Sequence, residues 1–300
     1  MTLEQLLMFK TVAKAGTLKA ASDKLFKTQP AISQGIKQLE SQLNLALFSR
    51  EGYRLVLTLE GKKLLQHAQR ILDEANELKY VAQHLSSGNE ASITVAFEAS
   101  FNLSRILPIL ELTQNSFPHT QIIIKQEYIT GATDALMNEK ADIIISSSAL
   151  AQMQSPEFEL AFLLSGCLID VASPALIARH PQLQSSSELT NEYQIVVQDT
   201  GTGTANIEYG VQSGQRRWYV TDFYTKKMLI ESGMGWGKLP QYLMESELNS
   251  GTLVHLDFKD RLNKIQLEYY VMRKTHKPLG PVAQALWQNL ANFAVKATSA

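Results

Sequence analysis

A long segment without proline divides this 300-residue chain into two parts. Residues 58–86 contain no proline and a single glycine, Gly61, so nothing in them interrupts a helix. Apolar side chains recur there at alternating spacings of four and three, the heptad pattern of a coiled coil. The pattern predicts a linker helix at 59–88 whose apolar seam needs a partner helix, and packing on the chain's own body is the alternative. The predicted seam consists of Leu64, Ala68, Ile71, Ala75, Leu78, Ala82 and Leu85.

Residues 1–58, which precede this helix, predict three short helices and a hairpin. Apolar side chains recur at helical spacing in residues 3–14, and a second helix over residues 18–26 follows the N-cap residue Thr17. A third helix over residues 29–43 follows Thr28, a good N-cap residue, and carries Pro30 in its first turn, where no helical N–H bond is lost. One side of this helix is apolar and the other is polar with few acids, which suits a recognition helix in a DNA major groove. A small helical bundle with a solvated polar face is the alternative.

The hairpin expected after the third helix is basic. Arg50 and Arg54 flank its turn, so it forms a wing whose arginines reach phosphate or the minor groove. Residues 1–70 contain eleven Lys and Arg against five Asp and Glu, and the rest of the chain contains seventeen against twenty-four. A basic segment on an acidic body indicates one part that meets a polyanion. We therefore predict a winged helix-turn-helix at 1–58 that contacts DNA through Thr28, Gln29, Pro30, Ser33, Gln34, Lys37, Arg50 and Arg54.

One motif runs without gaps through this N-terminal part. It comprises Ala20-Ala21, Leu25, the run from Gln29 to Glu40, Leu47-Phe48, Arg50, Leu57-Thr58 and Gly61. The motif resembles the N-terminal signature of LysR-type transcriptional regulators, and the length and later layout of the chain agree with that family. The resemblance implies a cytoplasmic, bacterial regulator that binds a partly palindromic operator in double-stranded DNA as a homodimer or homotetramer. It also implies that the linker helix makes the dimer, that the start of the third helix faces bases, and that the two arginines serve the wing.

Three positions depart from the family pattern. Asn44 stands where glycine is usual, but asparagine also tolerates left-handed backbone angles, so we expect the turn to survive. Thr17 replaces a serine with the same capping chemistry. Gln34 replaces a frequent arginine, which alters base preference and removes one phosphate contact.

From residue 89 onward, short β-branched runs alternate with amphipathic helices. Such alternation predicts an α/β architecture with a mostly parallel sheet. We divide this part into lobe I, residues 91–163 and 267–300, and lobe II, residues 164–266, so the chain crosses twice between them. Two crossings are typical of a periplasmic-binding-protein-like clamp, which LysR effector domains resemble. The sequence thus predicts a two-lobed effector-binding domain at 89–300.

Hydroxyl side chains follow three of the predicted strands of this domain. Ligands of open parallel sheets lie beyond the carboxyl ends of the strands, where helix N-termini favour an anion and hydroxyls add donors. We expect Thr130 to cap the helix that begins there, and we predict a small anionic metabolite in the cleft between the lobes. The expected effector-binding residues are Ser100, Phe101, Thr130, Ser146, Ser147, Ser148, Thr200, Thr202 and Phe223.

Other functions find little support in the sequence. The histidines are scattered without metal-ligand spacing, and no catalytic constellation is visible, so we expect no metal, no cofactor and no enzyme activity. Gly201 and Gly203 lack the third glycine of a nucleotide-binding loop. A solute-binding protein with a helical extension is an alternative, but the N-terminus lacks a signal peptide. No apolar run approaches the length of a membrane span.

Cys167, the single cysteine, lies in an apolar run and is interpreted as a buried structural thiol. A regulator of the same family that senses oxidants through Cys167 or through methionines is the alternative. Activation of transcription would also require contact with RNA polymerase, for which the sequence shows no surface patch.

Overall fold

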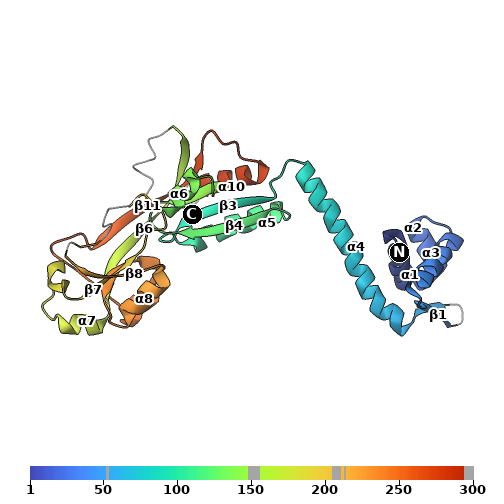
Figure 1. The fold of residues 1–300 in the computed structure, drawn as a ribbon, viewed down its shortest axis with the longest axis horizontal. Helices are drawn as coiled ribbons and strands as arrows, with labels where there is room; N and C mark the ends of the chain where they lie inside the picture. Colours follow the sequence, from blue (N-terminus) through green and yellow to red (C-terminus); the bar gives the residue numbers. More distant parts are fainter. Residues whose placement is uncertain (52–53, 148–155, 205–210, 213, 294–300) are drawn as a thin grey trace. The chain divides into compact units, whose positions relative to one another are not determined.

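The computed structural model describes residues 1–51, 54–147, 156–204, 211–212 and 214–293, apart from the side chains of residues 50, 51 and 54. The chain forms two compact units, Met1–Ser87 and Gly88–Ala300 (Figure 1). Within the described residues, no helix combines the length and the apolar composition that crossing a membrane requires.

The first unit begins with three helices packed around one core: α1 (Leu3–Ala15), α2 (Leu18–Leu25) and α3 (Gln29–Leu43). The hydroxyls of Thr17 and Thr28 cap α2 and α3, as predicted, by accepting backbone N–H bonds. Asn44 ends α3 in the left-handed region at φ 51°, so the expectation that asparagine replaces glycine there is confirmed. The turn between α2 and α3 uses Phe26 at φ 53°. These caps fix where each helix starts and stops, and therefore where the polar side of α3 begins.

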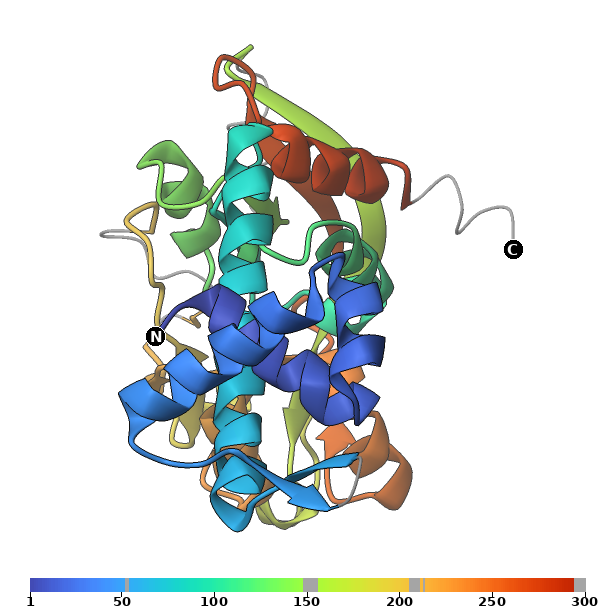
Figure 2. The ribbon, with the colours of Figure 1, turned by 90° about the vertical axis from the view of Figure 1, so that its right-hand side faces the viewer.

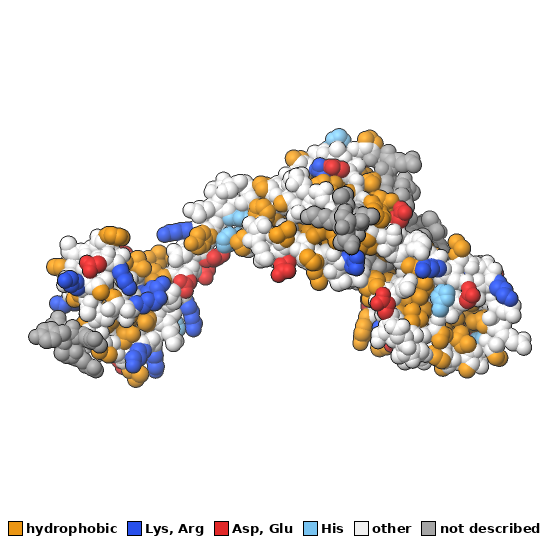
Figure 3. Space-filling view, turned by 180° about the vertical axis from the view of Figure 1, so that it is seen from behind, with side chains coloured by type: hydrophobic (Ala, Val, Ile, Leu, Met, Phe, Trp, Pro, Cys, Tyr) orange, Lys and Arg blue, Asp and Glu red, His pale blue; other side chains and the backbone are white. Residues whose placement is uncertain are grey.

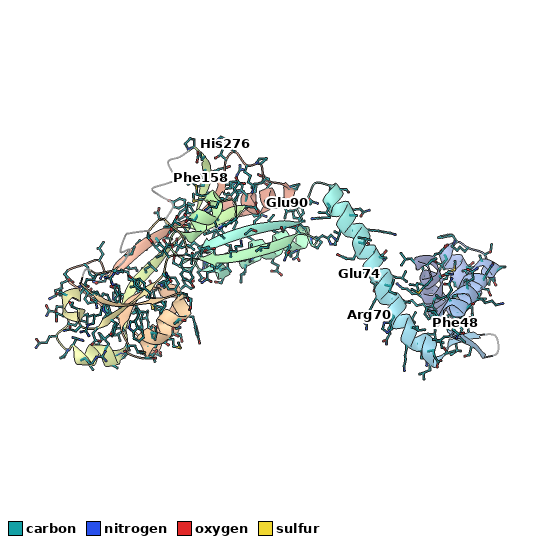
Figure 4. All side chains as sticks on the ribbon, viewed as in Figure 1. Phe48, Arg70, Glu74, Glu90, Phe158 and His276 are labelled. Carbon is teal, nitrogen blue, oxygen red and sulfur yellow. The ribbon has the colours of Figure 1, made fainter. Side chains whose placement is uncertain are left out.

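A two-stranded wing and a long helix complete this unit: β1 (Phe48–Glu51), β2 (Arg54–Leu57) and α4 (Leu59–Ser86). Figure 2 shows the hairpin beside the first turns of α4. The Glu40 carboxylate accepts the backbone N–H groups of Leu47 and Phe48 at 2.7 and 3.2 Å, which ties the wing to α3. The rings of Phe9 and Phe48 meet edge to face at 5.6 Å, and Figure 4 labels Phe48 at this junction.

The predicted seam of α4 is divided between two environments. Leu64 and Ala68 pack, together with Leu72, into the core formed by α1, α2 and α3, which we call the head. Ala68 is buried there. The expectation that the whole seam is free for a partner is therefore wrong at its first two positions, because α1 lies against this end of α4. Further along, Leu78 is 71% exposed, and the other large exposed members of the seam are Ile71 and Leu85.

The second unit is built on one sheet, which has nine strands in its described part. Strands β4, β3 and β5 run parallel at one end, and β9, β7 and β8 run parallel at the other. Between them β6 and β11 pair antiparallel along most of their length and pass through both lobes. The strands are β3 (Ser92–Glu98), β4 (Gln121–Glu127), β5 (Ile143–Ser146), β6 (Phe158–Ala172), β7 (Tyr193–Val197), β8 (Arg216–Val220), β9 (Trp236–Pro240), β10 (Val254–His255) and β11 (Lys264–Lys274).

Helices cover both faces of this sheet (Figure 1). In lobe I, α5 (Leu107–Ser116) and α10 (Pro281–Ala291) pack on one face and α6 (Gly131–Met137) on the other. In lobe II, α8 (Phe223–Glu231) covers one face and α7 (Pro174–Arg179) the other. Short elements, η1 (Leu103–Ile106), η3 (Ser186–Leu189), η4 (Gln241–Leu243) and α9 (Glu245–Ser250), join these layers. The predicted two-lobed α/β class is confirmed by this arrangement.

Several details differ from the predicted elements. Strand β9, which pairs with β6 and β7, was not predicted, because its sequence WGKLP lacks the alternation and β-branched residues that mark a strand. The expected lobe boundary at 163–164 falls inside β6, since this strand belongs to both lobes. Thr130 precedes α6 but makes no side-chain cap, because its hydroxyl donates to Asp199 instead.

Candidate functional site

The polar side of α3 is open in the first unit. Thr28, Gln29, Pro30, Gln34 and Lys37 are exposed, and Ser33 is half-buried. The opposite side of α3 is buried through Ile32, Ile36 and Leu39, which pack into the head. One helix side therefore holds the fold while the other presents amides, a hydroxyl and an ammonium group, the donors and acceptors that read base edges and phosphate.

Positive charge accumulates on this unit. Figure 3 shows Lys and Arg side chains predominating over Asp and Glu on the visible face of the head. Lys27 pairs with Glu4 at 2.6 Å, whereas Lys37 takes part in no ion pair among the described residues. The side chains of Arg50 and Arg54, predicted at the wing, lie outside the described residues, although their backbones form β1 and β2.

In the second unit, three of the predicted serines converge on one carboxylate. Glu98, the last residue of β3, is 8% exposed. Its Oε1 accepts from the Ser100 hydroxyl at 2.6 Å, and its Oε2 accepts from the Ser147 amide and hydroxyl, both at 2.8 Å, and from the Ser146 hydroxyl at 3.3 Å. The structure thus brings these serines together as the sequence predicted, but they are occupied as donors to a carboxylate. Ser148 lies outside the described residues.

Glu98 lines a small cavity between the lobes. The cavity has a volume of about 70 Å³, and its wall includes Ser100, Ser147, Tyr128 and Phe223. The rings of Tyr128 and Phe223 lie 5.5 Å apart. A second cavity, of about 390 Å³, shares this ring pair and adds further aromatic side chains: Phe97, Phe101, Tyr224 and Tyr242. Phe223 therefore stands between the two cavities, while Phe101 lines only the second.

The predicted threonines form a contact between the lobes. The Thr130 amide and hydroxyl donate to the Asp199 carboxylate at 3.0 and 2.7 Å. The Thr200 hydroxyl donates to Glu127 at 2.6 Å and accepts from the Tyr128 amide at 2.9 Å. The Thr202 amide and hydroxyl donate to Asp134 at 2.6 and 2.7 Å. We name these contacts between residues 127–134 and 199–204 the interlobe latch.

The latch requires glycine at its centre. A Cβ on Gly201 would lie 2.7 Å from the backbone nitrogen of Gly131, and one on Gly203 would lie 2.8 Å from Cγ2 of Thr130. The two glycines, which resemble part of a nucleotide loop in the sequence, thus allow two backbone segments to approach closely. Nearby, the Tyr242 hydroxyl of lobe II donates to the carbonyls of Ala99 and Phe101 at 3.2 and 3.1 Å. The lobes are therefore joined at two places beside the cavities.

The hydrogen bonds of the latch lower the pKa of Asp199. Burial alone would raise this pKa, but hydrogen bonds from Thr204, Gly201 and Thr130 together outweigh burial and lower it. Asp199 is consequently charged at neutral pH. Neither Asp199 nor Glu98 was predicted from the sequence, although Asp199 directly precedes Thr200 and Glu98 lies two positions before Ser100. The proximity of these carboxylates to the predicted hydroxyls was the signal available in the sequence.

Cys167 is half-buried in β6 rather than buried. Burial raises the pKa of its thiol, and Lys264 and Lys238 only partly oppose this effect. A protonated thiol at neutral pH is a poor nucleophile, which argues against oxidant sensing through this residue. In the described part of the chain, His, Cys, Asp and Glu form no group of three that could hold a metal ion.

A winged helix-turn-helix with an open recognition helix, followed by a two-lobed clamp with cavities between its lobes, defines a DNA-binding protein with a ligand-binding domain. The family model for the lysR family of bacterial regulatory helix-turn-helix proteins matches residues 3–62, and the LysR substrate binding domain model matches residues 86–294. The chain therefore belongs to the LysR family of transcriptional regulators, which act by binding DNA and effectors and are not enzymes.

Curated relatives agree with this assignment. The uncharacterized HTH-type transcriptional regulator YeeY of Escherichia coli K12 is 33% identical over 258 residues, which cover 84% of this chain and 82% of YeeY. The regulator AceR of Acinetobacter baumannii is 28% identical and covers 96% of each chain. Among solved structures, full-length LysG of Corynebacterium glutamicum with bound effector Arg matches with a TM-score of 0.53 at 19% identity, over 99% of both chains. That likeness establishes the shared fold.

Proposed function

We propose that this regulator binds a partly palindromic operator as a homodimer or homotetramer, and that a small effector in the cleft between the lobes changes its affinity for DNA. The observation that carries the proposal is the exposed polar side of α3. The caps of this helix and its buried opposite side fix the helix in place. One such helix contacts only a few base pairs, so tight specific binding needs two copies.

The exposed part of the α4 seam supports self-association. Ile71, Leu78 and Leu85 are large apolar side chains one heptad apart, and Ala75 and Ala82 stand between them. A second copy of the helix would bury them, with the alanines permitting a close approach. Because Leu64 and Ala68 belong to the head's own core, the paired part of the seam begins near Ile71.

The test compares wild type with Leu78→Gln and with Leu59→Gln, a matched control that is 68% exposed and lies off the seam. Sites are first found by genome-wide footprinting of bound DNA, and affinity for one site is then measured by fluorescence anisotropy at several salt concentrations. We expect Leu78→Gln to lower both the dimer fraction in sedimentation and the DNA affinity, and Leu59→Gln to change neither. Equal affinities for all three proteins would contradict paired binding.

A second arm tests the recognition helix. Gln34→Ala should relax base preference at one position, since an amide that contacts a base edge contributes about 1–3 kcal/mol of discrimination. Lys37→Ala should instead weaken binding to all sequences and reduce the salt slope by about one. Unchanged footprints for both variants would contradict the assignment of α3 as the reading helix.

A further inference from the structure

We infer that the cleft takes an organic cation, whose ammonium or guanidinium group lies at Glu98 between the lobes. The inference rests on the proposed function, because it names the chemical class of the effector for the same cleft. It replaces the anionic metabolite expected from the sequence.

Glu98 is a buried carboxylate without a cation. Its hydrogen bonds come from three hydroxyls and one backbone amide, and none of the ion pairs among the described residues includes it. Residues 148–155, which follow Ser147 and are not described, contain no lysine, arginine or histidine. Buried charges in proteins are normally paired, so the cavity lacks the partner that this carboxylate would bind best.

The serine hydroxyls that were predicted to bind an anion already donate hydrogen bonds to Glu98. Ser100, Ser146 and Ser147 all direct donors to Glu98, and each hydroxyl has only one proton to give. An anion in the small cavity would meet the charge of Glu98 while losing the donors that were meant to stabilise it. A cation meets an acceptor whose orientation is already fixed by four hydrogen bonds, which reduces the cost of ordering the site on binding.

The remaining walls fit an organic cation. Tyr128 and Phe223 form a ring pair on one side, and the faces of aromatic rings attract ammonium and guanidinium groups. Among the described residues that line the small cavity, Glu98 is the one with a charged side chain. The other lining residues include the apolar side chains of Leu168, Val197 and Leu267, which keep the effective dielectric low and strengthen an ion pair.

The volumes of the two cavities indicate which part of the ligand each cavity would hold. The cavity at Glu98, of about 70 Å³, has room for a cationic head group but not for a whole metabolite. The adjoining cavity of about 390 Å³ shares Ala99, Tyr128 and Phe223 with it and is lined largely by aromatic and aliphatic side chains. We therefore infer an amine or guanidine with an apolar body that extends past the ring pair.

The experiment uses probes of matched shape on the full chain. Phenethylammonium and butylguanidinium are compared with 3-phenylpropanoate and with phenethyl alcohol, each at up to about 10 mM, a range suited to fragments of this size. All three tryptophans, Trp218, Trp236 and Trp287, lie in the second unit, so tryptophan fluorescence during thermal unfolding reports on that unit alone. We expect a saturable rise in melting temperature with at least one cation and with neither control compound.

Two Glu→Gln variants locate the binding. Glu98→Gln keeps the shape of the side chain and removes its charge, and it should weaken the bound cation at least about 10-fold. Glu188→Gln is the matched control, since Glu188 accepts backbone N–H bonds at η3 and does not line either cavity. It should bind the cation as wild type does. The wild-type comparison of cation with carboxylate tests the inference even if Glu98→Gln does not fold.

The outcomes separate the inference from the proposed function. Stabilisation by 3-phenylpropanoate, no saturable shift with either cation, or equal cation affinity in wild type and Glu98→Gln would each overturn the cationic class, while operator binding through α3 would stand. If a cation binds at Glu98 but leaves DNA affinity unchanged in anisotropy, the ligand class holds and the regulatory role proposed for the cleft fails.

Discussion

The interlobe latch makes a quantitative prediction for Asp199→Asn. Asp199 Oδ1 accepts the Thr130 and Gly201 amides at 3.0 and 2.8 Å, and Oδ2 accepts the Thr130 and Thr204 hydroxyls at 2.7 and 2.6 Å. An asparagine keeps a carbonyl oxygen toward the two amides but loses the charge, and its Nδ2 cannot accept from the two hydroxyls, which must turn to accept from it instead. If only the two amide bonds weaken, by about 1 kcal/mol each, the second unit should lose at least about 2 kcal/mol of stability.

This loss is measurable by thermal unfolding with tryptophan fluorescence as the signal. For a unit of this size, about 2 kcal/mol corresponds to a melting temperature lower by about 4–8 °C. Asp260→Asn is the matched control, because Asp260 accepts bonds from Ser185 and Ser186 inside lobe II only. Both variants should melt earlier, but only Asp199→Asn should speed hydrogen exchange in residues 127–134, across the latch.

The effect should depend on pH with a defined sign. The pKa of Asp199 is lowered in the folded state, so its stabilisation is fully present above the unfolded value of about 4 and is lost as the pH falls through the folded pKa. The difference between wild type and Asp199→Asn should therefore be constant near pH 7 and shrink toward pH 3. A difference below about 1 °C at pH 7, or one that grows in acid, would refute this account of the latch.

Four further predictions concern other parts of the chain. Phe26→Ala should leave melting unchanged, because Phe26 is 96% exposed, yet weaken DNA binding in anisotropy by about 5-fold if this ring beside α3 packs on the DNA backbone. Gly61→Ala should lower the melting temperature of the head in circular dichroism, because its Cβ would overlap the carbonyl oxygen of Leu47, at a cost of about 1–3 kcal/mol. Burial lowers the pKa of Lys226 to about 7 while the unfolded side chain holds its proton to about pH 10.4, so Lys226→Met should raise the melting temperature at pH 7, with a gain that vanishes toward pH 10. Cys167→Ser should leave the response of DNA binding to peroxide unchanged, since burial keeps the thiol protonated.

The features predicted correctly from the sequence are local ones. Thr17 and Thr28 cap their helices and Asn44 ends α3, because each depends on hydrogen bonds to residues three or four positions away. The polar side of α3 also followed from helical spacing alone. The extent of the head's core could not be predicted in this way, because a heptad pattern does not distinguish packing on α1 from packing on a second copy of the helix. In the structure Ala68 packs into the core with residues of α1.

The cleft shows why site chemistry was harder to predict. Hydroxyls at strand ends were located correctly, but their partners Glu98 and Asp199 lie 49 and 69 positions away from Ser147 and Thr130. The pairing of β3 with β5 brings Ser147 to Glu98, and the contact between the lobes brings Thr130 to Asp199, whereas Ser100 lies only two positions from Glu98. The sign of the charge in the cleft depends on those long-range contacts. The site that was expected to bind an anion therefore contains carboxylates instead.

The latch and the small cavity are coupled because both depend on the same closure of the lobes. Tyr128 lies in the cavity wall, and its backbone takes part in the latch through Thr200. A ligand held between Glu98 of lobe I and Phe223 of lobe II binds only when the lobes are together, so its apparent dissociation constant equals the intrinsic one divided by the closed fraction. If Asp199→Asn lowers that fraction, cation affinity should fall although Asp199 does not line the cavity. Ligand binding should in turn slow hydrogen exchange at residues 199–204, because a ligand that binds only the closed lobes raises the closed fraction.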